Sequence, residues 1–181
     1  MLDDEGASAP GAEMSEEATP QSPPTTTFNI LFVCTGNTCR SPLAEGIARR
    51  ELERRGWSHV RVASAGVAAP RGEAAAAPAV SVARGHGIDL GQHRTQPVTP
   101  GLLDWADLVL AMGPNHLFGL DRMGEAEKNS TLGDFVAGGE GLGPSVSDPY
   151  GSDEAVYEVT YRELEGLVAA ALDRLEPILH P

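Results

Sequence analysis

Short apolar runs alternate along the chain with segments in which apolar residues recur at helical spacing. Each run predicts a buried strand, and each periodic segment predicts an amphipathic helix. The strands are predicted at residues 28–33, 60–65, 106–112 and 130–132. The helices are predicted at residues 42–55, 74–84, 100–104, 115–123 and 157–177.

The first helix carries clear boundary signals. Ser41 is a suitable N-cap residue, and Pro42 suits the first helical position because its missing N–H would have no partner there. Gly56 is the expected stop, since glycine readily adopts the left-handed conformation that ends many helices.

Strands and helices alternate through most of the chain, which is typical of a parallel sheet with helices on both faces. The sequence therefore predicts an α/β fold, a three-layer α/β/α domain with a central four-stranded parallel sheet over residues 28–181. Residues 1–27 hold six acidic residues, no Lys or Arg, and almost no large apolar residue. Such a segment buries too little surface to offset its ordering entropy, so it is predicted to be a disordered acidic tail.

Net charge and cysteine content limit the binding partners and the cellular compartment that the sequence suits. The 181 residues carry a formal net charge of −13, which argues against binding to nucleic acid or to an anionic membrane surface. No stretch is apolar for long enough to span a bilayer, and the N-terminus lacks a signal-peptide pattern, so we expect a cytoplasmic protein. Two cysteines, Cys34 and Cys39, are too few for a disulfide framework and suit a reducing compartment.

The first predicted strand leads into a loop, residues 34–42, with the sequence Cys-Thr-Gly-Asn-Thr-Cys-Arg-Ser-Pro. A loop at a helix N-terminus directs unpaired N–H groups and the positive end of the helix dipole at whatever binds there. Arg40 adds a planar fork of donors that matches phosphate oxygens. The same positive field favours a thiolate at Cys34, so the loop predicts a nucleophile inside an anion-binding cradle, which would follow the first strand.

This loop resembles the phosphate loop of the low-molecular-weight protein tyrosine phosphatases, in which a Cys is followed by five residues, an Arg and a Ser. Asn37 lies three positions after the Cys, as in that family. Residues 148–150, with the sequence Asp-Pro-Tyr, resemble the family's distal Asp-Pro-aromatic signature. The resemblance covers roughly residues 28–177, and an Asp before Pro would without it indicate only a turn.

The resemblance implies a cysteine-dependent protein phosphatase that forms a phosphocysteine intermediate. Cys34 would attack phosphorus, while Arg40 and the loop amides hold the phosphoryl oxygens. Asp148 would protonate the leaving group and then activate water. No metal or cofactor is expected, because Arg40 and the amides supply the positive charge.

Supporting roles follow from the same resemblance. Ser41 would donate a hydrogen bond to the sulfur of Cys34, and Asn37 would fix the turn because Asn tolerates a left-handed backbone. Ser64 and His86 match a hydrogen-bond network behind the loop. The expected phosphate-binding residues are Thr35, Gly36, Asn37, Thr38, Cys39 and Ser41, and the expected supporting residues are Ser64, His86 and Tyr150.

Thr38 bears on the choice of substrate. Tyrosine-directed members of the family usually carry an aliphatic residue at this position, whereas the bacterial protein arginine phosphatases carry Thr in the same string. A hydroxyl can accept a hydrogen bond from a guanidinium nitrogen, and polar groups of this kind contribute much of a site's discrimination. A single residue cannot fix specificity, so phosphotyrosine and phosphoarginine are both retained as candidate substrates. The expected partner is a phosphorylated protein substrate, and the enzyme is expected to be a monomer.

The remaining cysteine has two interpretations. In this family a second cysteine in the loop can form a reversible disulfide with the nucleophile, so Cys39 would protect Cys34 from irreversible oxidation. Alternatively, Cys39 is a small buried filler. Zinc binding by the two cysteines is disfavoured because no second ligand pair has suitable spacing. His59, His93 and His116 match no motif and are expected at the surface or in packing roles.

Two alternative functions use the same fold. An arsenate reductase-like thiol enzyme would pass oxidation to cysteines outside the loop, and this chain has none there. A non-catalytic phosphoprotein-binding domain typically lacks the nucleophile or the acid, and Cys34 and Asp148 are both present.

Overall fold

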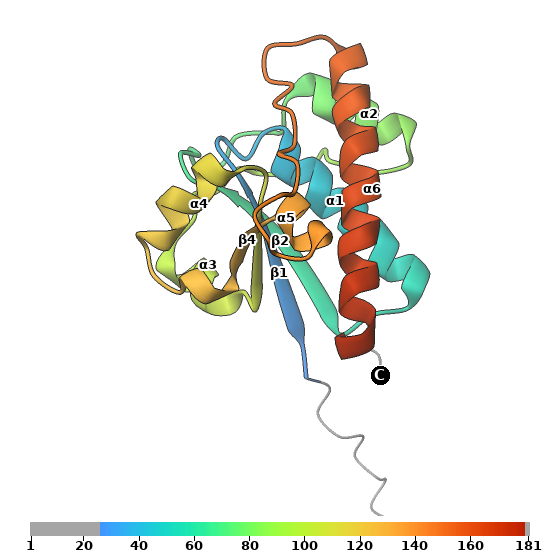
Figure 1. Ribbon diagram of the computed structural model, residues 1–181. Coiled ribbons are helices and arrows are strands. Elements are labelled where there is room, and N and C mark those ends of the chain that lie inside the picture. Colours follow the sequence, from blue (N-terminus) through green and yellow to red (C-terminus); the bar gives the residue numbers. More distant parts are fainter. Residues whose placement is uncertain (1–25, 180–181) are drawn as a thin grey trace, which may run out of the picture.

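The structure is a computed structural model that describes residues 26–179. Its four strands form one parallel sheet in the order β2-β1-β3-β4, which confirms the expected α/β class (Figure 1). The strands are β1 (Phe28–Cys34), β2 (Val60–Gly66), β3 (Leu108–Ala111) and β4 (Asn129–Thr131). The disordered tail predicted for residues 1–27 lies, apart from residues 26 and 27, outside the described residues.

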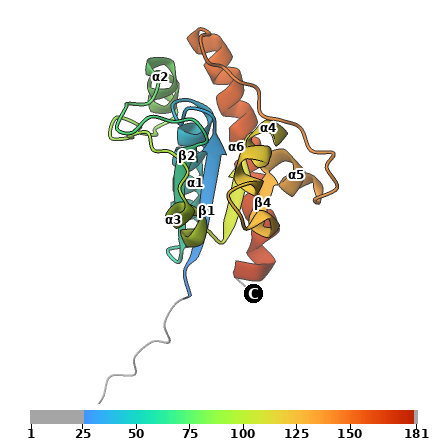
Figure 2. The same ribbon diagram turned by 90° about the vertical axis from the view of Figure 1, so that its left-hand side faces the viewer.

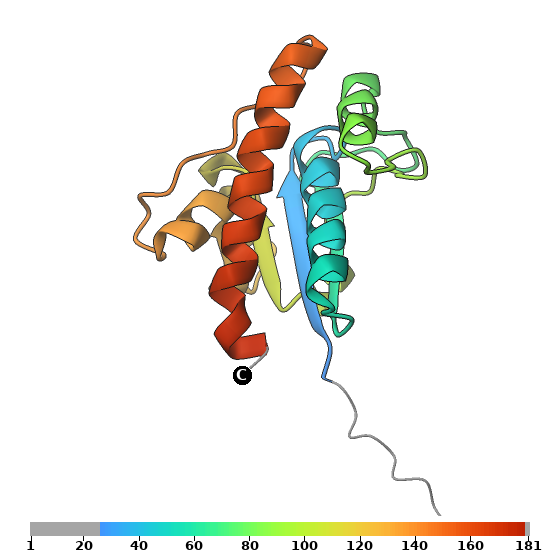
Figure 3. The same cartoon turned by 90° about the vertical axis from the view of Figure 1, so that its right-hand side faces the viewer.

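Six α-helices and one 3₁₀ helix accompany the sheet within the described part of the chain. They are α1 (Arg40–Arg55), α2 (Ala77–Gly85), α3 (Pro100–Trp105), α4 (Pro114–Asp121), η1 (Ala126–Lys128), α5 (Leu132–Ala137) and α6 (Glu154–Leu179). Helices α1 and α6 lie side by side over one face (Figure 3), and α3 and α4 cover the other (Figure 2). None of the helices described is long and apolar enough to cross a membrane.

Alternate residues of β1 supply the two cores. Ile30 and Phe32 pack beneath α1 and α6, whereas Leu31 and Val33 pack against α3 and α4. All four are at most 1 % exposed, as expected for a central strand covered on both faces. The period-2 geometry of the strand therefore produces the three predicted layers.

Several predicted boundaries were wrong by a few residues. Helix α1 begins at Arg40, with Cys39 at the N-cap, so Ser41 is not the cap. The Ser41 hydroxyl contacts the sulfur of Cys34 instead of a backbone N–H of the helix. The stop at Gly56 is confirmed, with φ of 70°.

The C-terminal half departs further from the prediction. Helix α6 starts before Tyr157 and continues past Pro177, which lies so close to the end that it disturbs only the last turn. Helix α5 was missed, although Thr131 provides the signal: its side chain accepts a hydrogen bond from Asp134 N at 3.0 Å. The third strand is shorter than expected, and α2 begins at Ala77 rather than at 74.

The ends of β1 and β2 place the loop of residues 34–41. Cys34 pairs with Gly66 at the carboxyl edge of the sheet, at the top of Figure 1. A Cβ at Gly66 would lie 2.9 Å from Asn37 N and would also meet the carbonyl oxygen of Thr35. Only glycine therefore leaves room for the loop to fold down on β2.

Candidate active site

The loop between β1 and α1 lines a cavity of about 340 Å³. The loop residues on its wall are Cys34, Thr35, Gly36, Thr38, Cys39 and Arg40. Residues distant in sequence complete it: Pro70, Glu73, Asp148 and Tyr150. A larger hollow of about 620 Å³ lies at the opposite end of the sheet between Trp57 and Trp105. It contains neither cysteine, so we place the candidate site at the loop.

A hydroxyl group lies next to the candidate nucleophile. Ser41 Oγ is 3.0 Å from Cys34 Sγ, and both residues are buried. The serine sits in the first turn of α1, so the helix fixes its position relative to the end of β1. A hydroxyl at this distance can donate a hydrogen bond to a thiolate sulfur.

Asn37 holds the loop from beneath. Its backbone is left-handed, with φ of 56°, and its side chain is completely buried. Its amide nitrogen donates to Ser41 Oγ at 2.8 Å and to Ser64 Oγ at 3.0 Å. Its amide oxygen accepts from Gln96 N at 3.0 Å. The turn is therefore bonded to α1, to β2 and to the segment that precedes α3.

The histidine behind the loop is His93, and the placement expected for His86 was wrong. His93 Nε2 lies 2.8 Å from the backbone oxygen of Asn37, a contact across 56 residues of sequence. Ser64 is where it was expected, and it also donates to Glu45 Oε2 at 2.5 Å. His93 has no sequence motif of its own, so only the fold could reveal it.

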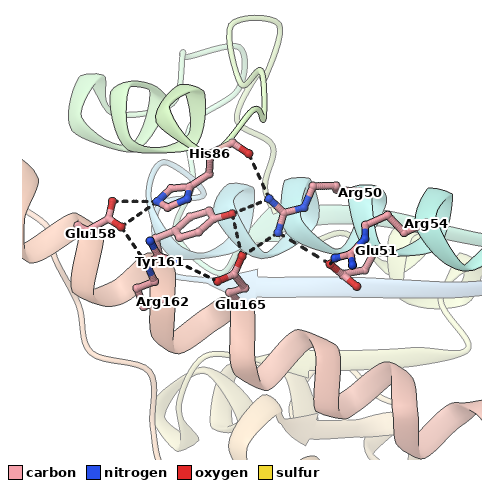
Figure 4. A network of polar contacts seen from close by, with 8 residues as sticks. All are labelled: Arg50, Glu51, Arg54, His86, Glu158, Tyr161, Arg162 and Glu165. Atoms are coloured by element: carbon pink, nitrogen blue, oxygen red, sulfur yellow. Dashed lines mark hydrogen bonds and ion pairs between the residues drawn. The ribbon is translucent and has the colours of Figure 1, made fainter.

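His86 belongs to a separate polar network between the end of α2, α1 and α6 (Figure 4). Its ring stacks on Tyr161, with centroids 3.9 Å apart, and its Nε2 lies 2.8 Å from a carboxylate oxygen of Glu158. Arg50 donates to the Tyr161 hydroxyl at 2.9 Å and to Glu165 at 2.9 Å. The network therefore joins α1, the end of α2 and α6, and none of its hydrogen bonds among the described residues reaches residues 34–39.

A second missed histidine supports the start of the loop. His116, on α4, is 1 % exposed, and its Nε2 lies 2.9 Å from Thr35 Oγ1. Burial lowers the pKa of His116 below the ordinary 6.5, and the nearby positive charge of Arg40 lowers it further. The neutral imidazole is therefore favoured beside the cavity.

Arg40 and Asp148 meet across the cavity. Arg40 Nη2 lies 3.2 Å from Asp148 Oδ2, and Arg40 Nη1 donates to the carbonyl of Val146 at 3.3 Å. The guanidinium is nearly buried, whereas the carboxylate side chain is 53 % exposed. Asp148 Oδ1 also accepts from Tyr150 N at 3.1 Å, which shapes the turn that carries both residues.

Cys39 lies on the α6 side of the cavity. Its Sγ is 3.0 Å from the hydroxyl of Tyr157 and 3.5 Å from Thr38 Oγ1. Burial raises the pKa of Tyr157, and its hydrogen bond with Cys39 raises it further. Both cysteines are free thiols, so the protective disulfide with Cys34 stays a prediction.

Positive charge at the cavity comes from the loop itself. Arg40 and Cys34 line the same cavity, and the loop leads into the N-terminus of α1, where unpaired N–H groups and the helix dipole favour an anion. Within residues 26–179, no three His, Cys, Asp or Glu side chains are grouped closely enough to hold a metal ion.

A cysteine at the floor of such a cradle, with an arginine and a carboxylate above it, defines a class of enzymes that transfer phosphoryl groups through a cysteine thiolate. The match to known families agrees with this class. The chain belongs to the low molecular weight phosphotyrosine protein phosphatase family, whose model matches residues 29–177. This membership confirms the expected hydrolase class, and it implies phosphorylated proteins as substrates.

Individual relatives carry two kinds of name. A protein-arginine-phosphatase of Geobacillus stearothermophilus is 39% identical over 151 residues, covering 82% of this chain and 97% of the relative. The crystal structure of a low molecular weight protein tyrosine phosphatase from T. tengcongensis is 41% identical, with a TM-score of 0.76 over 82% of this chain and 100% of that one. A YwlE arginine phosphatase mutant with a phosphorylated active site serine is 38% identical, with a TM-score of 0.77 over 82% of this chain and 96% of its own.

Proposed function

We propose that this enzyme hydrolyses phosphoarginine side chains of proteins through a phosphocysteine at Cys34. The observation that carries this choice of substrate is Thr38, a hydroxyl-bearing residue that lines the same cavity as Cys34. Its neighbour is the weakly hydrogen-bonding sulfur of Cys39, at 3.5 Å, so it is available to a substrate N–H. The similarity to proteins named arginine phosphatases supports the same choice.

Substrate binding would use the charge of the cradle. The phosphoryl oxygens accept hydrogen bonds from the loop amides and from the guanidinium of Arg40. Arg40 contacts Asp148 at 3.2 Å, so a bound phosphoryl group competes with that carboxylate for the arginine. Binding of the phosphoryl group therefore weakens the contact between Asp148 and Arg40, which frees the Asp148 carboxyl group to protonate the leaving group.

Two chemical steps follow. In the first, the thiolate of Cys34 attacks phosphorus while the phosphorus–nitrogen bond breaks, and the leaving nitrogen takes a proton from the carboxyl group of Asp148. In the second, the Asp148 carboxylate takes a proton from a water molecule that attacks phosphorus. The sulfur–phosphorus bond then breaks, and inorganic phosphate leaves. Ser41, at 3.0 Å, stabilises the thiolate that departs.

The cavity also bears on the alternative functions. Cys34, Arg40 and Asp148 all face the same space, so the residues needed for turnover are together. This arrangement favours an enzyme over a binding-only domain. The monomeric state, the cytoplasmic location and the absence of nucleic-acid or membrane partners stay predictions.

The substrate proposal is tested by measuring kcat/KM on matched phosphoarginine and phosphotyrosine peptides. We expect the wild-type enzyme to prefer phosphoarginine and Cys34→Ser to be inactive on both. Thr38→Val removes only the hydroxyl and keeps the shape of the side chain, whereas Thr38→Ser keeps the hydroxyl. Loss of a hydrogen bond to a charged group predicts a roughly tenfold lower kcat/KM on phosphoarginine for Thr38→Val. A wild-type preference for phosphotyrosine would contradict the proposal.

A further inference from the structure

The wall of the active-site cavity carries a second carboxylate that the reaction does not use. Glu73 lines the cavity together with Cys34, Arg40 and Asp148. Asp148 is paired with Arg40 at 3.2 Å, whereas Glu73 forms no ion pair with any residue that the structure describes. An acidic residue thus lines an anion-binding cavity and forms no ion pair within residues 26–179.

The backbone of Glu73 is held firmly at this position. Its N–H donates to Thr95 Oγ1 at 3.0 Å, and its carbonyl accepts from Thr95 N at 2.8 Å. Thr95 is only 2 % exposed, so this anchor is part of the packed structure. The segment is also bonded to the loop, because Ala76 N donates to the carbonyl of Thr38 at 2.9 Å. Glu73 and Thr38 are therefore fixed in place relative to each other.

Charge decides which substrate this wall suits. The nitrogen of phosphoarginine is bonded directly to phosphorus, so a phosphoryl group above Cys34 places the cationic guanidinium beside the cavity walls. Its N–H groups then need acceptors in a partly desolvated space. Phosphotyrosine presents a neutral ring with no donors there, and a carboxylate would only repel its phosphoryl dianion.

We infer that Glu73 is a specificity-determining residue whose carboxylate binds the guanidinium of the substrate on the same wall as Thr38. This inference rests on the proposed function and extends it, because it assigns the recognition of positive charge to a residue outside the phosphate loop. Glu73 is exposed and lies outside the helices and strands, so its side chain can be changed without disturbing the core.

The test compares two substitutions on two substrates. Glu73→Gln keeps the size of the side chain and removes its charge, and Glu73→Lys reverses the charge. Glu176→Gln is the matched control, since Glu176 is exposed near the far end of α6 (Figure 1). A charge-assisted hydrogen bond predicts a roughly tenfold lower kcat/KM on a phosphoarginine peptide for Glu73→Gln, and a larger decrease for Glu73→Lys. With an aryl phosphate, which offers no N–H donor to this wall, Glu73→Gln should not lower kcat/KM.

The outcomes separate this inference from the proposed function. Suppose that the wild type hydrolyses phosphoarginine. If Glu73→Gln then lowers kcat/KM equally on both substrates, or on neither, the role of Glu73 is refuted while the proposed function stands. If the wild type does not hydrolyse phosphoarginine, the proposed function fails, and arginine amide then tests the wall directly. Arginine amide should inhibit aryl phosphate turnover more strongly than lysine amide, and Glu73→Gln should remove that difference. No difference in the wild type would refute the guanidinium site.

Discussion

Asn37 offers the sharpest test of how the loop is held. Its buried side chain makes three hydrogen bonds, to Ser41, Ser64 and the N–H of Gln96, while its backbone has φ of 56°. Asn37→Ala removes the three bonds and places an unsuitable residue in a left-handed conformation. Asn37→Gly removes the same bonds and tolerates that conformation. The pair therefore separates the hydrogen bonds from the backbone strain.

The expected magnitudes follow from these contacts. Each buried hydrogen bond contributes about 1 kcal/mol net, so the loss of all three should lower the free energy of unfolding by about 3 kcal/mol. The left-handed conformation costs alanine roughly 1 to 2 kcal/mol more. Glycine avoids this cost but gives the unfolded chain more entropy, about 0.4 to 1 kcal/mol. We therefore expect Asn37→Gly to be roughly 0.8 kcal/mol more stable than Asn37→Ala.

Urea unfolding followed by tryptophan fluorescence measures these differences. Asn115→Ala, at an exposed position of α4, is the control and should change stability by no more than about 0.5 kcal/mol. Turnover of an aryl phosphate should decrease in both Asn37 variants, because the amides of the loop lose their fixed position. A stability loss below about 1 kcal/mol for Asn37→Ala would show that the hydrogen bonds do not hold the loop. A glycine variant less stable than the alanine variant would show that the left-handed backbone at this position does not strain alanine.

Two further predictions concern charged and titrating groups at the cavity. Asp148→Asn should lower kcat by about 10² to 10⁴ if Asp148 is the general acid. The free energy of unfolding of Asp148→Asn, measured in urea, should differ from that of the wild type by less than about 1 kcal/mol, because the carboxylate is 53 % exposed. An unchanged kcat would exclude Asp148 as the general acid. His116 has a native pKa below 6.5 because it is buried near Arg40, so the unfolded state binds its proton more tightly. The neutral His116 imidazole contributes fully to stability above pH 6.5, and this contribution is lost as the pH falls below that value. The His116→Gln variant should therefore lose less stability than the wild type between pH 7.5 and 5.5. Equal losses of stability would contradict this prediction.

The cradle was predictable because its residues are contiguous. Cys34, Asn37, Arg40 and Ser41 lie in one loop, and the geometry of a strand followed by a helix places them around one point. The parallel sheet followed from the alternation of strands and helices, which depends on local periodicity. Asp148 was found only through the resemblance to a family, since its pairing with Arg40 spans most of the domain.

The two histidines near the loop could not be found in this way. The contact of His93 with Asn37 spans 56 residues, and that of His116 with Thr35 spans 81. Neither residue lies in a local pattern, and the flanking glycines of His86 made it the more conspicuous candidate. Its stacking on Tyr161 shows that helix-end signals mark a packing position as readily as a functional one.

Discrimination between substrates has to come from the walls of the cavity rather than from its floor. The floor consists of Cys34, backbone amides and Arg40, which bind any phosphoryl group in the same way. The walls differ in character: Thr38 presents a hydroxyl, Glu73 a negative charge and Tyr150 an exposed aromatic ring. These residues belong to three separate segments, and only Thr38 is part of the phosphate loop. Under the proposal for Glu73, the preference for a substrate therefore depends on a residue outside the phosphate loop as well as on Thr38 within it.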